Sequence, residues 1–281
     1  MKKWFPDPSE FYVGYIPKAP ASIALIIRKI IFVLIFVMIV VASILAWQQK
    51  KFSSANFEYG VNSALEGYIF NEPVPHMLIP LGNDIQGKEL YQTALLVGFG
   101  KSGADKFTQA LGITQKNQEG SKVRLTGSLI YGDGKTLLQI DENSKLTFLE
   151  AHVPIVSTSY EEENFSRSGE IVDPKCYFGV MKPGEGKAHR SCAIRCIAGG
   201  IPPVFKTDSA GYFLLVNENR EPISSEIAAL VGDHITLTGR AMRWNDWTIL
   251  SVDSQMIQQL SATKRWKENL MAFEQNMTQC K

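Results

Sequence analysis

The chain has 281 residues, of which 20% are charged and 45% hydrophobic, and its formal net charge at pH 7 is +1. This length allows one large domain, or two small ones beside a membrane anchor. Proteins that bind nucleic acid carry a clustered excess of basic residues, and this near-neutral chain has no such excess, so we expect no DNA or RNA partner.

The N-terminal part of the chain predicts a membrane anchor after a short arm. Residues 1–19 contain prolines and aromatic residues without periodicity, and we expect an irregular cytoplasmic arm there. The run Ile30–Trp47 is apolar and contains no charged residue, and as a helix it is long enough to cross the hydrocarbon core of a lipid bilayer. We place the transmembrane anchor at residues 20–50. A cleaved signal peptide is the alternative, although no clear small-x-small cleavage site follows the run.

The basic residues around this run predict its orientation. Five precede the run and two follow it: Lys2, Lys3, Lys18, Arg28, Lys29, and then Lys50 and Lys51. Because the more basic flank of a membrane helix stays on the cytoplasmic side, we expect a single-pass membrane protein with a cytoplasmic N-terminus. The C-terminal domains would then be periplasmic or otherwise extracytoplasmic.

The rest of the chain contains an internal repeat. Gly120–Asp141 and Gly232–Asp253 align at a constant offset without a gap, with seven identities in 22 positions. In each copy a run rich in β-branched residues passes through a Leu-Thr-Gly step to a turn, Gly132-Asp133-Gly134 or Asn245-Asp246. This pattern predicts a β-hairpin in each copy. Duplication of one structural unit is the simplest explanation.

Upstream of each hairpin, the pattern predicts three strands and a helix. The expected strands are Gly67–Phe70, Met77–Leu81 and Thr93–Val97 in the first copy, and Gly169–Asp173, Pro203–Lys206 and Tyr212–Val216 in the second. The expected helices are Ala104–Leu111 and Ser224–Val231. The order β-β-β-α-β-β resembles the OB-fold, a small five-stranded barrel.

We therefore expect a mainly β protein with two OB-like five-stranded barrels, at residues 60–155 and 165–256. Three prolines make the second strand of the first copy its weakest element, because proline restricts strand pairing: Pro73, Pro75 and Pro80. A C-terminal helix is expected over residues 257–281, where apolar residues recur at roughly helical spacing.

The two copies differ most between their first and second strands. From the first-strand glycine to the end of the third strand, the second copy (Gly169 to Val216) is longer than the first (Gly67 to Val97). The extra segment is a Gly- and Pro-rich loop with four candidate ligands: Cys176, His189, Cys192 and Cys196. A loop between the first two strands is one of the places where OB-folds take ligands. The insertion therefore lies where a functional site is expected.

These four residues admit two kinds of chemistry. Thiolate and imidazole ligands suit a zinc or copper ion, or an iron–sulfur cluster with one imidazole ligand. In an oxidising compartment, Cys176 can instead form a disulfide with Cys192 or Cys196, and Cys280 is then available for the remaining thiol. Both readings stay open at this point, beside a third in which the cysteines are unrelated structural residues.

The stretch Gly169–Pro203, with its core His189-x-x-Cys192-Ala-x-x-Cys196, resembles an uncharacterised group of bacterial exported or membrane-anchored proteins. The resemblance implies that the segment is a functional unit, and it names no reaction. A second motif, Gly98-Phe-Gly-Lys-Ser-Gly103, matches the dinucleotide fingerprint G-x-G-x-x-G. Because the unit then closes as a hairpin, we expect a turn with a helix start there.

No Ser/His/Asp or paired-carboxylate arrangement can be assigned from the sequence, so an enzyme is the less favoured class. We expect a non-catalytic subunit or accessory protein of a redox membrane complex, such as a respiratory complex, with other membrane subunits as partners. The alternatives are a structural interaction module with a disulfide-stapled loop, and an enzyme that keeps an open position on its metal.

Overall fold

The computed structural model describes residues 21–48, 55–110, 120–150, 162–179, 181–209, 211–224 and 226–264. The chain divides into two units, Met1–Lys51 and Phe52–Lys281. The predicted arm at residues 1–19 lies outside the described residues.

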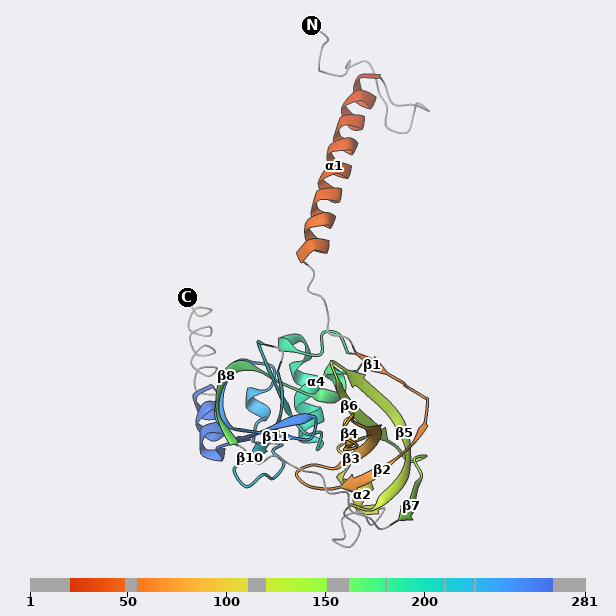
Figure 1. Cartoon of the computed structure of the whole chain (residues 1–281). Helices are drawn as coiled ribbons and strands as arrows, with labels where there is room; N and C mark the ends of the chain where they lie inside the picture. Colours follow the sequence, from red (N-terminus) through yellow and green to blue (C-terminus); the bar gives the residue numbers. More distant parts are fainter. Residues whose placement is uncertain are drawn as a thin grey trace. The chain divides into compact units, whose positions relative to one another are not determined.

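The N-terminal unit contains one long apolar helix (Figure 1). This helix, α1, spans Ala21–Gln48, and its large apolar side chains are exposed. Ile23–Gln48 forms a candidate span of 26 residues. At a rise of 1.5 Å per residue it is about 39 Å long, which exceeds the hydrocarbon core of about 30 Å. By length and composition α1 is a candidate membrane span, and a signal sequence near the N-terminus has the same features.

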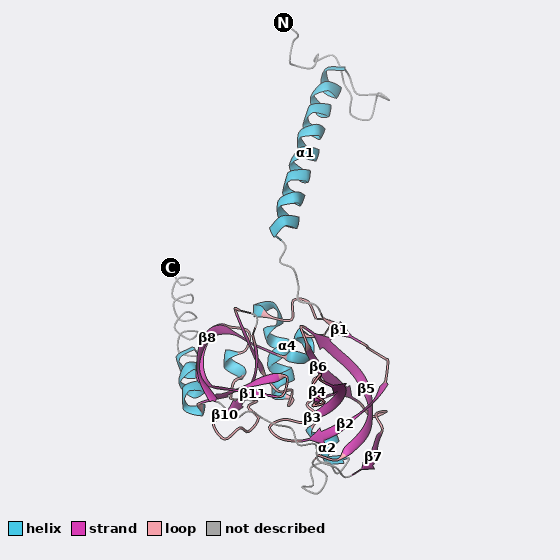
Figure 2. Ribbon diagram, viewed as in Figure 1, coloured by secondary structure: helices cyan, strands magenta, loops and turns pink. Residues whose placement is uncertain are grey.

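The first barrel is a closed sheet of five strands. These are β2 (Ser63–Phe70), β3 (His76–Asn83), β4 (Glu89–Gly98), β5 (Lys122–Gly132) and β6 (Lys135–Ile140). They pair in the circular order β2-β3-β4-β6-β5, and only β4 and β6 are parallel. The helix α2 (Asp105–Ala110) connects β4 toward β5. Two short strands, β1 (Asn56–Phe57) and β7 (Leu146–Glu150), pair with β5 outside the barrel (Figure 2).

The second barrel repeats this topology. Its strands are β8 (Glu162–Val172), β9 (Val204–Thr207), β10 (Tyr212–Asn217), β11 (His234–Trp244) and β12 (Trp247–Val252). The circular order is β8-β9-β10-β12-β11, and again only the third and fifth strands, β10 and β12, are parallel. A 3₁₀ turn, η2 (Ala228–Leu230), precedes β11, and residues 254–264 form a helix after β12.

The predicted fold class is confirmed, with an N-terminal apolar helix, two closed five-stranded barrels and a C-terminal helix. The repeat also holds in register, since β5 begins at Lys122 and β11 at His234, two residues that the gapless alignment matches with each other. Two details differ from expectation. The helix of the second copy is only a 3₁₀ turn, and the C-terminal helix begins at residue 254. Residues 265–281, the rest of the predicted C-terminal helix, lie outside the described residues.

The two barrels pack against each other through the outer faces of β4 and β6, so both faces of these strands are buried. We call this contact region the seam. Along β4, Ala94 and Leu96 fill the first barrel, whereas Leu95 and Val97 belong to a second core cluster. That cluster also contains Val172 and Trp247 of the second barrel. Because side chains alternate between the faces of a strand, a continuous apolar run such as Ala-Leu-Leu-Val serves both cores. The seam between the barrels is therefore itself a hydrophobic core.

Candidate metal centre in the seam between the barrels

The insertion of the second copy is helical, which corrects the prediction of a loop. The helix α3 spans Pro174–Tyr177 and α4 spans Gly186–Ala198. Asp173 starts α3 by accepting a hydrogen bond at Oδ1 from the backbone N–H of Lys175, at 2.9 Å, and Pro174 occupies the first helical position. α4 begins where the N–H of Gly186 donates to the Glu170 carboxylate of β8, at 2.5 Å.

Three of the four predicted ligands lie on one face of α4. His189, Cys192 and Cys196 are spaced three and four residues apart. At 3.6 residues per turn, this spacing keeps the three side chains within an arc of about 60°. The fourth, Cys176, comes from α3. The helical spacing was present in the sequence, but the surrounding glycines and prolines favoured a loop.

The three cysteines come together as a sulfur triad. The Sγ atoms of Cys176, Cys192 and Cys196 all lie within 4.8 Å of one another. Cys196 is buried, and the other two are half-buried. Among the residues that the structure describes, these three cysteines are free thiols. Cys280 lies outside the described residues.

His189 belongs to a second triad rather than to the sulfur triad. Ligand atoms of Asp173, Cys176 and His189 lie within 4.8 Å of one another, so Cys176 is common to both triads. Asp173 is 0% exposed and His189 is 4% exposed. Asp173 Oδ2 and His189 Nε2 have no hydrogen-bond partner among the described residues. Two buried polar atoms therefore remain available to a ligand at this point.

Sequence reasoning missed Asp173. Its only signal is its position three residues before Cys176, at the start of a short helix. An aspartate before a proline is usually interpreted as a helix cap or a turn residue. Asp173 reaches the cluster because the packing of α4 against α3 brings His189 close to Asp173 and Cys176.

The electrostatics of the cluster favour a protonated Cys176 thiol and a neutral His189 imidazole. The pKa of the Cys176 thiol is raised strongly by its contact with Cys196, by burial and by the negative charge of Asp173. Burial lowers the pKa of His189, and this outweighs the attraction of Asp173 for the imidazolium. A neutral His189 keeps a lone pair for coordination. A bound cation would supply the positive charge that lets the thiols ionise.

The glycine-rich segment Gly98–Gly103 of the first barrel contacts both ends of the insertion. As expected, this segment forms a turn that is followed by α2. The buried Lys175 Nζ donates to the carbonyl oxygens of Gly98 and Gly100, at 2.6 and 2.8 Å. The N–H of Gly103 donates to Gly199 O, at 2.7 Å, beside the end of α4. These glycines allow the backbone of the turn to approach the insertion closely.

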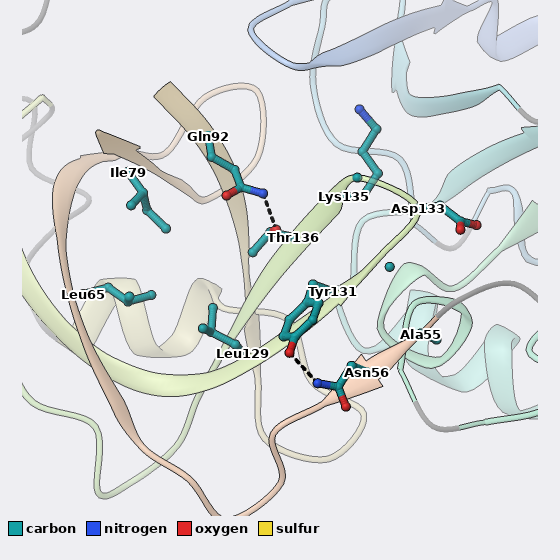
Figure 3. Close-up of a pocket in the computed structure, with 12 residues that line it drawn as sticks. Ala55, Asn56, Leu65, Ile79, Gln92, Leu129, Tyr131, Asp133, Lys135 and Thr136 are labelled. Carbon is teal, nitrogen blue, oxygen red and sulfur yellow. Dashed lines mark hydrogen bonds between the residues drawn. The ribbon is translucent and has the colours of Figure 1, made fainter. Parts of the chain in front are cut away.

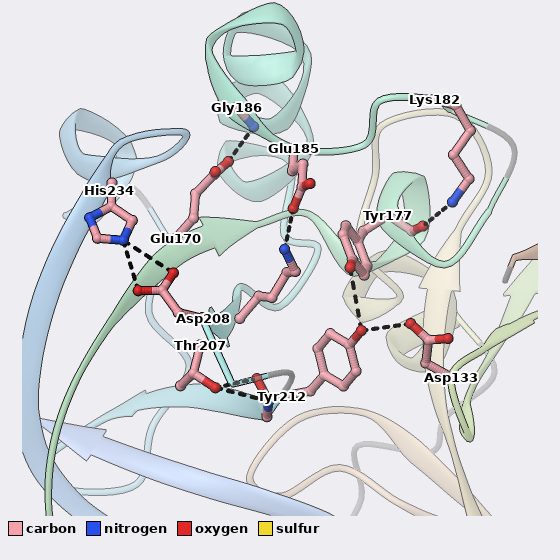
Figure 4. A network of polar contacts seen from close by, with 12 residues as sticks. Asp133, Glu170, Tyr177, Lys182, Glu185, Gly186, Thr207, Asp208, Tyr212 and His234 are labelled. Atoms are coloured by element: carbon pink, nitrogen blue, oxygen red, sulfur yellow. Dashed lines mark hydrogen bonds and ion pairs between the residues drawn. The ribbon is translucent and has the colours of Figure 1, made fainter. Parts of the chain in front are cut away.

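A polar network ties the start of the insertion to both barrels (Figure 4). The Tyr212 hydroxyl donates to Asp133 Oδ2 in the β5–β6 turn, at 2.6 Å, and lies 3.3 Å from the Tyr177 hydroxyl of α3. Lys206 of β9 pairs with Glu185 just before α4. Burial raises the pKa of Tyr212, and the hydrogen bond to Asp133 raises it further, so Tyr212 remains a protonated donor. The network fixes α3 and the start of α4 relative to the strands.

Comparison with protein families, with curated proteins and with solved structures finds no match. Thiolate sulfur, imidazole nitrogen and carboxylate oxygen are all recognised metal ligands. Three close cysteines with a histidine and an aspartate can hold a metal ion.

A hollow of about 560 Å³ opens into one end of the first barrel, and all five barrel strands contribute to its lining (Figure 3). Leu65, Ile79 and Leu129 supply apolar side chains to it, and these also pack against the core of the barrel. Four of its polar side chains form two pairs: Gln92 Nε2 donates to Thr136 Oγ1 at 2.6 Å, and Asn56 hydrogen-bonds to the Tyr131 hydroxyl at 2.5 Å. None of the sequence-predicted site residues lines this hollow. We therefore consider the Cys/His/Asp cluster the better candidate for the functional site.

Proposed function

We propose that this chain is a membrane-anchored, non-catalytic protein that binds zinc through the Cys/His/Asp cluster. The observation that supports this most strongly is the pair of buried polar atoms without partners, Asp173 Oδ2 and His189 Nε2, beside three free thiols. A buried polar group that lacks a hydrogen bond costs about 1–3 kcal/mol. Coordination of a metal ion offsets this cost.

The spacing of the donors suits a metal ion. Around a tetrahedral zinc ion, bond lengths of about 2.0–2.3 Å place neighbouring ligand atoms about 3.3–3.8 Å apart. Within each triad the ligand atoms already lie within 4.8 Å of one another. Side-chain movements of the order of 1 Å therefore close either triad on an ion.

The chemistry of the donors favours zinc over the other expected groups. Zinc accepts sulfur, nitrogen and oxygen together, whereas copper(I) prefers the sulfur ligands and would leave the Asp173 carboxylate unused. Two-iron clusters are held by four cysteines, or by two cysteines and two histidines, whereas this site offers three cysteines, one histidine and one aspartate.

The position of the site supports a structural role for the ion. The cluster lies beside the core that joins the barrels, and Cys196 is itself part of that core. Zinc has no redox chemistry of its own. We propose that the ion fixes the two barrels, which we assign as OB-folds on their shared circular strand order, into one rigid exported body.

We further propose that α1 anchors this body to the membrane with the N-terminus in the cytoplasm, as a subunit or accessory protein of a redox membrane complex. The basic residues before the apolar run support the orientation. A periplasm-dependent reporter fused after Lys281 should be active, and an inactive reporter would reverse the topology. Purification from membranes in mild detergent should retain other membrane subunits, and a protein that always purifies alone would argue against the complex.

Elemental analysis of the full chain in detergent, combined with thiol titration, tests metal binding. We expect bound zinc, and we expect His189→Ala to lower the zinc content because it removes a ligand. Ser191→Ala is the matched control, because Ser191 is exposed on the same helix and should leave the content unchanged. Metal-free protein in which two of the cysteines resist titration until reduced would support the disulfide-stapled interaction module instead.

A further inference from the structure

We infer that the cluster is a dinuclear centre in which the Cys176 thiolate bridges two metal ions. This inference rests on the proposed zinc binding and specifies how many ions the same site binds and which ligand they share. The observation behind it is that the five donors form two triads, Cys176–Cys192–Cys196 and Asp173–Cys176–His189, which share only Cys176.

One ion cannot serve both triads. Ligand atoms around one tetrahedral ion lie at most about 3.8 Å apart, whereas the five donors do not form one group even at 4.8 Å. Along α4, His189 and Cys196 are seven residues apart, which is a rise of about 10.5 Å. Cys192 and Cys196, four residues apart, can share one ion. His189 is then left to a second ion further toward the start of the helix.

A single ion in the sulfur triad would also leave the unpaired atoms unexplained. Asp173 and His189 belong to the other triad, so a single ion in the sulfur triad would leave Asp173 Oδ2 and His189 Nε2 buried without partners. A second ion held by Asp173, His189 and the bridging Cys176 would give both side chains a partner. Thiolate sulfur has enough lone pairs to bind two ions at once.

The charge of the donors also favours two bound metal ions. Three thiolates and one carboxylate carry four negative charges, which two divalent ions neutralise. One divalent ion in the sulfur triad would leave two negative charges in a site where Asp173 and Cys196 are fully or nearly fully buried. The nearby Lys175 ammonium, bound to backbone carbonyls, cancels at most one of them. Uncompensated buried charge is costly, so the two-ion state is favoured over a single ion in the sulfur triad.

Metal stoichiometry of the full chain in detergent tests the proposal. Metal-free protein is titrated with Zn²⁺, and bound ions are counted by native mass spectrometry and elemental analysis. We expect two ions per chain in the unaltered protein and in the exposed control Ser191→Ala. Asp173→Asn combined with His189→Ala should bind one ion, as should Cys192→Ser combined with Cys196→Ser. One ion per chain in the unaltered protein would overturn the dinuclear centre, whereas no bound metal would overturn the proposed zinc function itself.

Cobalt(II) tests the bridge separately from the count. Two cobalt ions joined by one thiolate couple magnetically, so the electron paramagnetic resonance signal per ion should be lower in the fully loaded protein than in the Asp173→Asn/His189→Ala variant loaded with one ion. Circular dichroism checks that this variant is folded. Two bound ions with an undiminished signal per ion would mean two independent sites, and the bridging role of Cys176 would be wrong.

Discussion

His76 shows how the seam between the barrels controls the chemistry of a single residue. The side chain is 3% exposed, and its Nδ1 atom lies 2.8 Å from Val74 O. The ring stacks on Phe70 at 5.3 Å and meets Trp244 of the second barrel edge-on at 4.5 Å. Burial lowers the pKa of His76 to about 4, because the charged ring would lose its water. His76 is therefore a buried residue at the start of β3.

This pKa predicts acid sensitivity. In the unfolded chain His76 takes up a proton near its ordinary pKa of about 6.5, whereas in the folded protein it stays neutral down to about pH 4. The unfolded state therefore binds more protons as the pH falls through this window, and stability is lost. Between pH 7 and 4.5 His76 should contribute a loss of about 2 kcal/mol in the free energy of unfolding.

Urea unfolding of metal-free protein at the two pH values measures this loss. His76→Phe keeps an aromatic ring in the seam and removes the titrating group. Its stability should fall less between pH 7 and 4.5 than that of the unaltered protein, by about the same 2 kcal/mol. An equal fall in both proteins would mean that His76 does not titrate in this window.

Lys175 provides a second prediction at the level of a residue. Its buried ammonium donates to two carbonyl oxygens of the glycine-rich turn, so Lys175→Met would leave both without that donor. We expect metal-free protein to lose about 1–3 kcal/mol of unfolding free energy, measured in urea. Lys187→Met on the exposed face of α4 is the control and should change it by less than about 0.5 kcal/mol. Losses of the same size in both variants would contradict the role of Lys175.

The elements themselves were predictable where the pattern was local. The hairpins of both copies followed from alternating β-branched residues around Gly and Asn turns, and β5 and β11 begin at the positions that the repeat matches. The insertion was placed correctly between the first two strands, but its helices were missed because glycines and prolines surround α4. The pairing of Asp173 with the cysteines and His189 could not be predicted, because it depends on how α3 packs against α4 and not on spacing along the chain.

The contact between the glycine-rich turn and the end of α4 predicts a sharp steric effect. A Cβ atom at Gly103 would lie 2.2 Å from Gly200 O, a backbone atom that cannot move away without shifting α4. Gly103→Ala should therefore destabilise the protein by about 1–3 kcal/mol. Thermal unfolding measures this, with the exposed neighbour Ser102→Ala as the control. Equal melting temperatures for the two variants would show that the turn and α4 are not packed this closely.

At the scale of the whole two-barrel region, the barrels share one core and should behave as one folding unit. The shared cluster takes residues from both barrels and from the insertion, among them Leu95, Ile130, Phe178, Ile201 and Trp247. The insertion of the second copy thus fills the seam with the first. A duplication that produced two separable domains would have left a polar surface at this place, whereas β4 and β6 bury both faces.

Phe178 can test whether the barrels unfold as one unit. It is fully buried in the seam and packs edge-on against Trp247 at a ring-centroid distance of 6.2 Å. Phe178→Ala should lower the free energy of unfolding by about 3–5 kcal/mol. Hydrogen exchange should then show an equal loss of protection in the central strands of both barrels, because both open only by global unfolding. Leu81→Ala, at an exposed position of β3, should leave both barrels protected. If the loss in Phe178→Ala were confined to β8–β12 while β2–β6 kept their protection, the barrels would unfold independently, and a metal site in the seam could not act as their clamp.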